Sequence, residues 1–161
     1  MNAMRALLPH TRMRRRDWVA AGLAGFTGLT GLVSVRPALA LAPDLRAAID
    51  GFTGGATLRD GRVEIEVASL VENGNVVPIA ISVDSPMTGA DHVRALAVFN
   101  ERNPQRDVAR FTLGPRAGRA RVSTRIRLAT SQQLVAVAVL SDGSVWSRSV
   151  EVIVTLAACI E

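Results

Sequence analysis

From residue 56 onward, apolar and polar residues alternate with a period of two over most of the chain. Short alternating runs separated by glycine, asparagine, aspartate and serine are typical of β-strands packed in a sandwich. Strands are expected at 62–68, 76–83, 93–100, 108–113, 120–128, 134–140 and 144–156. This number of strands within roughly a hundred residues predicts an all-β, immunoglobulin-like β-sandwich over residues 56–156.

Two segments between these runs predict hairpin turns. Residues 72–75 read Glu-Asn-Gly-Asn and residues 141–144 read Ser-Asp-Gly-Ser, and both contain residue types that tolerate a positive φ angle. Pro78 has no amide hydrogen to donate, so it is expected at a sheet edge or a bulge.

Residues 41–55 follow a different pattern, which predicts a short helix and a linker before the sandwich. Leu45, Ala48 and Ile49 fall on one face of a helix that begins at Pro43. Gly51 is expected to end it soon afterwards.

Residues 1–40 have the three parts of a secretory signal peptide. A basic segment ends in Arg14-Arg15-Arg16, an uncharged stretch covers 18–35, and the small residues Ala38-Leu39-Ala40 follow. The arginine pair resembles a twin-arginine signal, which directs folded proteins to the bacterial periplasm. Cleavage is expected after Ala40 or Ala42. The alternative is an uncleaved membrane anchor, because about 18 apolar residues is close to the shortest span of a bilayer.

The charge of the chain is concentrated in this signal sequence. The formal net charge is +5, and residues 1–40 contain six arginines and one acid, so the remaining segment is neutral. A neutral domain gives no electrostatic reason to expect nucleic acid as a partner.

The strand at 120–128 has one cationic face. Its alternate positions carry Arg119, Arg121, Ser123, Arg125 and Arg127, and the intervening positions carry Val122, Thr124, Ile126 and Leu128. The arginine face is interpreted as a solvated outer face; the alternative is a contact for an acidic partner or an anionic substrate.

Residue types suited to catalysis or metal binding are scarce after residue 40, where there is one histidine, His92, and one cysteine, Cys159. A metal site with several nitrogen or sulfur ligands is therefore not expected. The segment has no glycine-rich phosphate loop and no nucleophile elbow. His92 is expected to be a surface or packing residue, and Glu64 and Glu66 are assigned no role. The large side chains expected in the core or an interface, rather than at a cofactor, are Met87, Phe99, Phe111 and Trp146.

Cys159 is the third residue from the end of the sequence. A lone cysteine is most often a buried apolar filler. Here the last strand is expected to end near Leu156, so that residues 157–161 form a projecting arm. An unpaired cysteine in an oxidising compartment is an intermolecular linkage point or a reactive thiol. A thiol on an arm suits a carrier, since it can be presented to several enzymes in turn and its thiolate accepts the load.

Five ordered segments of the chain resemble the SoxY family, the sulfur-carrier subunit of the periplasmic thiosulfate-oxidising (Sox) system. They are residues 72–78, 83–88, 99–104, 123–129 and 135–146. The resemblance implies a carrier without catalytic activity or cofactor, which pairs with a SoxZ-like subunit and holds sulfur intermediates covalently on Cys159. It also implies partner enzymes: a cytochrome-type transferase that attaches thiosulfate, a hydrolase that releases sulfate, and a sulfane dehydrogenase that oxidises the remaining sulfur.

The chain departs from the family at its end. The family's arm reads Gly-Gly-Cys-Gly-Gly, whereas residues 157–161 read Ala-Ala-Cys-Ile-Glu. Alanine restricts the backbone, so a stiffer arm is expected. The negative charge of Glu161 should raise the pKa of the Cys159 thiol and repel an anionic sulfur compound. Two versions stay open: a working carrier with altered partners or substrate, and a non-carrying paralogue that acts as a non-covalent interaction module or a disulfide-linked dimer. A weaker alternative is reversible binding of a small sulfur compound at the arginine face.

Overall fold

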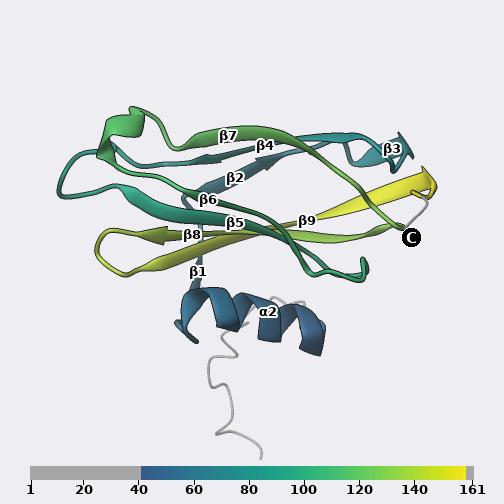
Figure 1. Ribbon diagram of the computed structural model, residues 1–161, viewed down its shortest axis with the longest axis horizontal. Helices are drawn as coiled ribbons and strands as arrows, with labels where there is room; N and C mark the ends of the chain where they lie inside the picture. Colours follow the sequence, from purple (N-terminus) through teal and green to yellow (C-terminus); the bar gives the residue numbers. More distant parts are fainter. Residues whose placement is uncertain (1–40, 159–161) are drawn as a thin grey trace, which may run out of the picture. The chain divides into compact units, whose positions relative to one another are not determined.

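The structure is a computed structural model that describes residues 41–158 (Figure 1). The predicted signal sequence, Cys159, Ile160 and Glu161 lie outside the described residues. No helix within the described part of the chain is long and apolar enough to cross a membrane.

The described chain forms an α-helix, nine strands and a 3₁₀ turn. In chain order they are α2 (Pro43–Thr53), β1 (Leu58–Asp60), β2 (Val63–Glu66), β3 (Leu70–Asn73), β4 (Val77–Val83), β5 (Val93–Asn100), β6 (Asp107–Thr112), η1 (Pro115–Ala117), β7 (Arg121–Ile126), β8 (Gln132–Leu140) and β9 (Val145–Leu156). The seven strands predicted from the sequence correspond to β2 and β4 to β9, with ends that shift by at most two residues.

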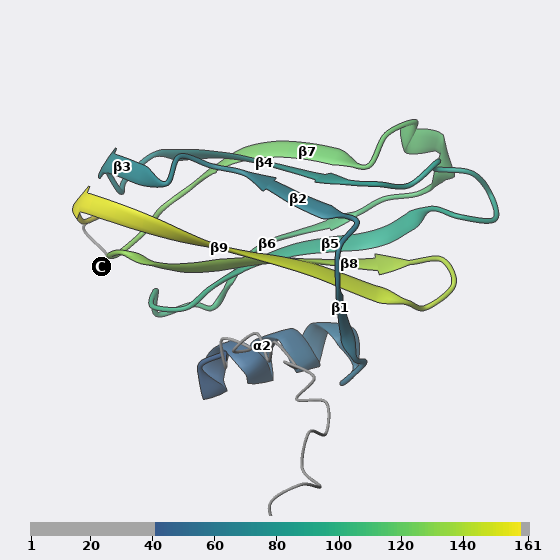
Figure 2. The same cartoon turned by 180° about the vertical axis from the view of Figure 1, so that it is seen from behind.

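The strands form two sheets that face each other (Figures 1 and 2). The larger sheet has the order β1-β9-β8-β5-β6, with β3 also paired to β9, and the smaller sheet has the order β2-β4-β7. Alternate side chains of both sheets point into a shared core of valine, leucine and isoleucine, including Ile81, Leu96 and Leu134, which are fully buried. The predicted all-β sandwich preceded by a short helix is confirmed.

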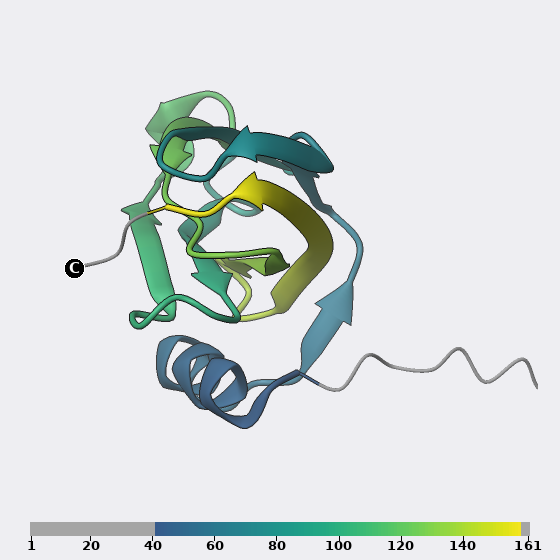
Figure 3. The same cartoon turned by 90° about the vertical axis from the view of Figure 1, so that its right-hand side faces the viewer.

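Helix α2 covers the outer face of the larger sheet (Figure 3). Leu45 and Ile49 are fully buried in a second apolar cluster, against outward-facing residues of the sheet such as Phe99. The rings of Phe52 and Phe99 meet edge to face, with centroids 5.8 Å apart. The helix therefore runs through Gly51, where it was predicted to stop, because packing of the partly buried Phe52 against Phe99 offsets the weak helix propensity of glycine. It ends at Gly54, which has a φ of 68°.

The two predicted turns have different outcomes. Residues 141–144 join the antiparallel strands β8 and β9, with Gly143 at a φ of 81°, so this hairpin is confirmed. Residues 72–75 do not form a hairpin: β3 pairs with β9 and β4 pairs with β2 and β7, so the turn connects one sheet to the other. Gly74 is not among the glycines with a positive φ.

Pro78 lies on β4, the middle strand of the smaller sheet. The last residue of β2 pairs with Ala80, so β4 has only the β7 partner, Arg125, at the level of Pro78. The proline therefore has an open strand edge beside it, as its missing amide hydrogen requires. Of the four large side chains expected in the core or an interface, Met87 and Phe99 are buried, and Phe111 and Trp146 are partly buried against the core.

Candidate functional site

The candidate site is the end of β9, because Cys159 follows directly after the last described residue. The strand ends at Leu156, as predicted. Ala158, however, does not project: it is only 7% exposed, and its amide donates to the carbonyl oxygen of Leu128 at 3.1 Å. The backbone is thus held on the sandwich up to the residue before the thiol. The sulfur attachment residue predicted from the sequence, Cys159 itself, lies outside the described residues.

Three segments meet at this point in a chain of backbone hydrogen bonds, which we call the Gly74 seam: Gly74, Leu128, Leu156 and Ala158. The amide of Gly74 donates to the oxygen of Leu156 at 2.9 Å, and the amide of Leu128 donates to the oxygen of Gly74 at 2.8 Å. A Cβ atom on residue 74 would lie 2.3 Å from the oxygen of Leu128 and 3.0 Å from the amide nitrogen of Ala158. Glycine is required here by close approach of backbones, not by a positive φ.

A cluster of side-chain amides holds the Leu128 segment in place. Asn103 donates from Nδ2 to the oxygen of Arg127 at 2.8 Å, and its Oδ1 accepts from the amide of Ala129 at 3.0 Å. The same Oδ1 accepts from Nε2 of Gln132 at 2.7 Å, and Gln132 is only 2% exposed. On the other side of the seam, the amide of Val154 donates to Oγ of Ser131 at 2.9 Å. Two loops and the final strand are therefore connected around the site.

Sequence reasoning did not find this seam. Asn103 lies in a segment that carries the family resemblance, but the sequence pattern assigns no role to Asn103, Ser131 or Gln132. Their partners lie far apart in the sequence, so no local pattern reports the cluster. The only local signal was the Gly74 position, which was interpreted as a turn glycine.

The arginine face lies on the outer surface of the smaller sheet, and its side chains are exposed as predicted. It is not uniformly cationic, because both side-chain nitrogens Nη1 and Nη2 of Arg121 pair with the carboxylate of Glu66 at 2.7 Å. This hydrogen-bonded pair lowers the pKa of Glu66 and raises that of Arg121. Glu66, which was assigned no role, neutralises part of the face. The adjacent shallow depression of about 440 Å³ is lined by residues of both signs, including Glu66 and Arg125.

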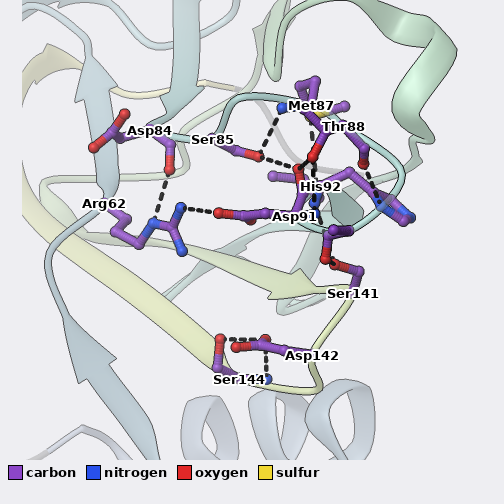
Figure 4. A network of polar contacts seen from close by, with 12 residues as sticks. Arg62, Asp84, Ser85, Met87, Thr88, Asp91, His92, Ser141, Asp142 and Ser144 are labelled. Atoms are coloured by element: carbon purple, nitrogen blue, oxygen red, sulfur yellow. Dashed lines mark hydrogen bonds and ion pairs between the residues drawn. The ribbon is translucent and has the colours of Figure 1, made fainter.

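A second polar cluster closes the opposite end of the sandwich, around the loop between β4 and β5 (Figure 4). Arg62, at a φ of 52°, donates from Nε to the oxygen of Asp84 at 2.8 Å and from Nη2 to Oδ2 of Asp91 at 2.9 Å. His92 donates its main-chain amide to Oγ of Ser141, and its Nδ1 lies 3.0 Å from the oxygen of Thr88. This histidine packs the loop, as predicted. Among the described residues, no three His, Cys, Asp or Glu side chains are grouped to hold a metal ion.

Fold and site together define a class: a small two-sheet β-sandwich backed by one helix, with its last strand fastened immediately before a lone cysteine. The chain matches the family model described as sulfur oxidation protein SoxY over residues 49–159, which is more than half of its length. The chain therefore belongs to the SoxY family, and the resemblance noted in the sequence is confirmed. The matched region ends on Cys159.

Solved structures agree with this assignment. The chain is similar to the sulfur carrier protein SoxY from Chlorobium limicola f thiosulfatophilum, with a TM-score of 0.60 and 28% identity over 70% of this chain and 96% of that chain. It also resembles a putative superoxide reductase from Thermotoga maritima, with a TM-score of 0.52 and 21% identity over 60% of this chain and 93% of that chain.

A variant of the superoxide reductase (neelaredoxin) from Ignicoccus hospitalis gives a TM-score of 0.53 and 20% identity, over 72% of this chain and 94% of that chain. At this level of identity, both superoxide reductase matches show the shared fold alone. No curated protein sequence matches the chain.

Proposed function

We propose that this chain is a periplasmic sulfur carrier, which holds sulfur intermediates covalently on Cys159 while partner enzymes act on them. The observation that carries the proposal is the SoxY family match, which extends to Cys159 and ends there. The likeness to a solved SoxY sulfur carrier adds to it. The protein is accordingly a carrier on which enzymes act, and not itself an enzyme.

The loading chemistry forms one S–S bond. The Cys159 thiolate joins the outer sulfur of thiosulfate, and two electrons leave the pair for a cytochrome-type transferase. A hydrolase then uses water to cleave the bond between the outer sulfur and the sulfonate group, which releases sulfate and two protons and leaves a persulfide anion on Cys159. A sulfane dehydrogenase oxidises that remaining sulfur. The thiolate is the nucleophile in the first step, so loading requires a deprotonated thiol.

The position of Ala158 supports a carrier that offers the Cys159 thiol to its partner enzymes in a different way from the rest of the family. Its amide is bonded to Leu128 and its side chain is buried, so the chain is fastened one residue before the thiol. Only one peptide bond separates this fastened residue from Cys159. A partner enzyme must therefore approach the sandwich itself to reach the sulfur. We favour a working carrier with altered partners or substrate, because the family's cysteine is kept at position 159.

Export by the twin-arginine route and pairing with a SoxZ-like subunit are part of the same proposal. Of the two cleavage sites, the one after Ala40 is favoured by the start of the helix. Leu41 and Ala42 pack against the apolar cluster under α2, and the oxygen of Ala42 accepts from the amide of Arg46 at 2.9 Å. Cleavage after Ala42 would remove these contacts.

Mass spectrometry of the protein from its own host tests the proposal. The mature protein is isolated after growth with and without thiosulfate, and its intact mass is recorded before and after reduction. We expect reducible sulfur or thiosulfonate additions in the thiosulfate culture, on a peptide containing Cys159, and none on the matched variant Cys159→Ser. Additions that persist in Cys159→Ser, or an unmodified thiol under both conditions, would overturn the proposal.

A non-carrying paralogue is the second candidate. Ala157 and Ala158 replace the glycines that the family's arm carries, and burial of Ala158 restricts presentation of the thiol. In that case the protein is an interaction module, and Cys159 at most forms a disulfide-linked dimer. Protein with a blocked thiol would then retain full biological activity.

A further inference from the structure

Four large apolar side chains of the described chain are exposed, and all of them lie near the end of β9. They are Leu70, Val76, Ile153 and Leu156, each 52–62% exposed, and we call them the β9-end patch. Elsewhere in residues 41–158 the large apolar side chains are buried or partly buried. Exposed apolar side chains that gather at one place mark sites of protein contact.

Strand pairing explains why these residues lie together. Leu70 on β3 and Ile153 on β9 are register partners in a parallel pair, and the next partners, Val71 and Val154, face the core. Leu70 and Ile153 therefore point outward side by side. Leu156 pairs with Asn73, directly before the turn that leads to Val76. It lies on the face of β9 that carries Val152 and Val154, and it is exposed at the end of that face. Figures 1 and 2 both show β3 beside the last residues of β9, at the end where the described chain stops.

The patch is next to the fastened backbone that precedes Cys159. Leu156 is itself bonded to Gly74 through its oxygen, and Ala158 is fixed to Leu128. Cys159 follows Ala158 directly in the sequence, so we expect an active site that acts on its sulfur to contact the domain surface beside this seam. Several enzymes act on the proposed carrier in turn, so none of them can remain bound at this surface. A transient partner is therefore favoured, and four side chains suit the small interface of such a complex.

The charges beside the patch indicate the chemistry of the partner. Glu72 is on the outward face of β3 with Leu70, and Glu151 is on the outward face of β9 with Ile153; both are exposed. These carboxylates complement a cationic rim. An enzyme that binds an anionic sulfur oxyacid needs cationic groups at its site, since such groups form the strongest hydrogen bonds to oxyanions.

We propose that the β9-end patch is the docking surface for the enzyme that loads Cys159, and that this enzyme presents an apolar surface with a cationic rim. The inference rests on the proposed carrier function. It adds a place of contact on this chain, namely the exposed side chains of Leu70, Val76, Ile153 and Leu156 beside the Gly74 seam.

The test compares enzymatic with non-enzymatic modification of Cys159. Purified mature protein is incubated with thiosulfate and a periplasmic extract of thiosulfate-grown host cells, and the rate of adduct formation is measured against carrier concentration. In parallel, the thiol is titrated with a small aromatic disulfide. Leu70→Thr/Ile153→Thr removes the apolar contacts and places a β-branched residue, which suits a strand, at both positions. Glu72→Lys reverses one charge at the patch, and Glu64→Lys, on the outer face of the smaller sheet, is its matched control.

We expect the double variant to raise the KM for the carrier about tenfold, the size of effect seen for truncated interface anchors. Glu72→Lys should raise it about threefold, more at low salt than at high salt, and Glu64→Lys should leave it unchanged. Reaction with the small disulfide should stay within twofold of the parent in every variant.

Equal enzymatic loading of the double variant and the parent would overturn the docking inference while the carrier function stands. A parallel loss of reaction with the small disulfide would also overturn it, because the substitutions would then act on the thiol itself. A parent that sediments as a dimer and a double variant that sediments as a monomer would make the patch a self-interface instead. Absence of loading in the parent refutes the carrier function, and the docking inference fails with it.

Discussion

The Gly74 seam makes a quantitative prediction for the substitution Gly74→Ala. The new Cβ would lie 2.3 Å from the oxygen of Leu128, a distance at which the backbone has to move. Separating the two segments lengthens the hydrogen bonds from Leu128 to Gly74 and from Ala158 to Leu128. Each such bond contributes about 1 kcal/mol net, and inserting a methyl group into a packed site costs about 1–3 kcal/mol. The free energy of unfolding should fall by about 3–5 kcal/mol.

Urea unfolding followed by tryptophan fluorescence measures this change, because Trp146 is partly buried against the core. The matched control is Gly89→Ala: no atom lies within 4 Å of a Cβ at that position, and its φ is not in the positive range. That control should change stability by less than about 0.5 kcal/mol, or raise it slightly by restricting the unfolded chain. If Gly74→Ala and Gly89→Ala unfold at the same urea concentration, the seam does not fasten the end of β9 and the reasoning is refuted.

Three further substitutions test other parts of the structure. Asn103→Ala removes the oxygen that accepts the shortest hydrogen bond from Nε2 of the buried Gln132. The free energy of unfolding in urea should fall by about 2–3 kcal/mol, and a fall below about 0.5 kcal/mol would contradict the role given to the amide cluster. Leu45→Ala removes a fully buried side chain between α2 and the larger sheet. The free energy of unfolding should fall by about 3 kcal/mol, and unfolding should remain one cooperative transition. A separate, earlier transition of the helix would show that α2 is not part of the folded unit. Hydrogen bonds from Ser144 lower the pKa of Asp142 below its usual 3.8. The ionised carboxylate therefore stabilises the fold above pH 3.8, and this contribution is lost as the pH falls through the lowered pKa. Acid titration of Asp142→Asn should show a shallower loss of stability below about pH 4 than the parent, and an identical slope would contradict this role of Asp142.

The sequence predicted the strands that alternate strongly and failed on the strands that depend on a distant partner. β4, β5 and β8 alternate or are apolar throughout, because one or both of their faces are buried. β1 and β3 are only three and four residues long, mostly exposed, and exist through parallel pairing with β9. No local pattern encodes such pairing, since the partner is more than eighty residues away.

The candidate site could be predicted only in part, for the same reason. Cys159 follows from composition and position, since it is the one cysteine of the sequence. How the chain reaches it could not be predicted: Gly74 has the same type of sequence context as Gly143, yet Gly143 supplies a positive φ and Gly74 supplies space. The two roles differ only in what packs against the glycine.

The loss of glycine before Cys159 and the burial of Ala158 are two aspects of one arrangement. Position 158 is only 7% exposed, so the methyl group of alanine stabilises the fold there by filling space. A glycine at this position would pack less well and would make the backbone more flexible. Under the proposed carrier function, a fastened residue 158 leaves contact with the loading enzyme to the domain surface. The exposed side chains of Leu70 and Ile153 lie beside that seam and supply such a surface. In the proposed carrier, docking at the end of β9 would compensate for the shorter arm and would explain how a chain without the family's glycines keeps the family's cysteine in use.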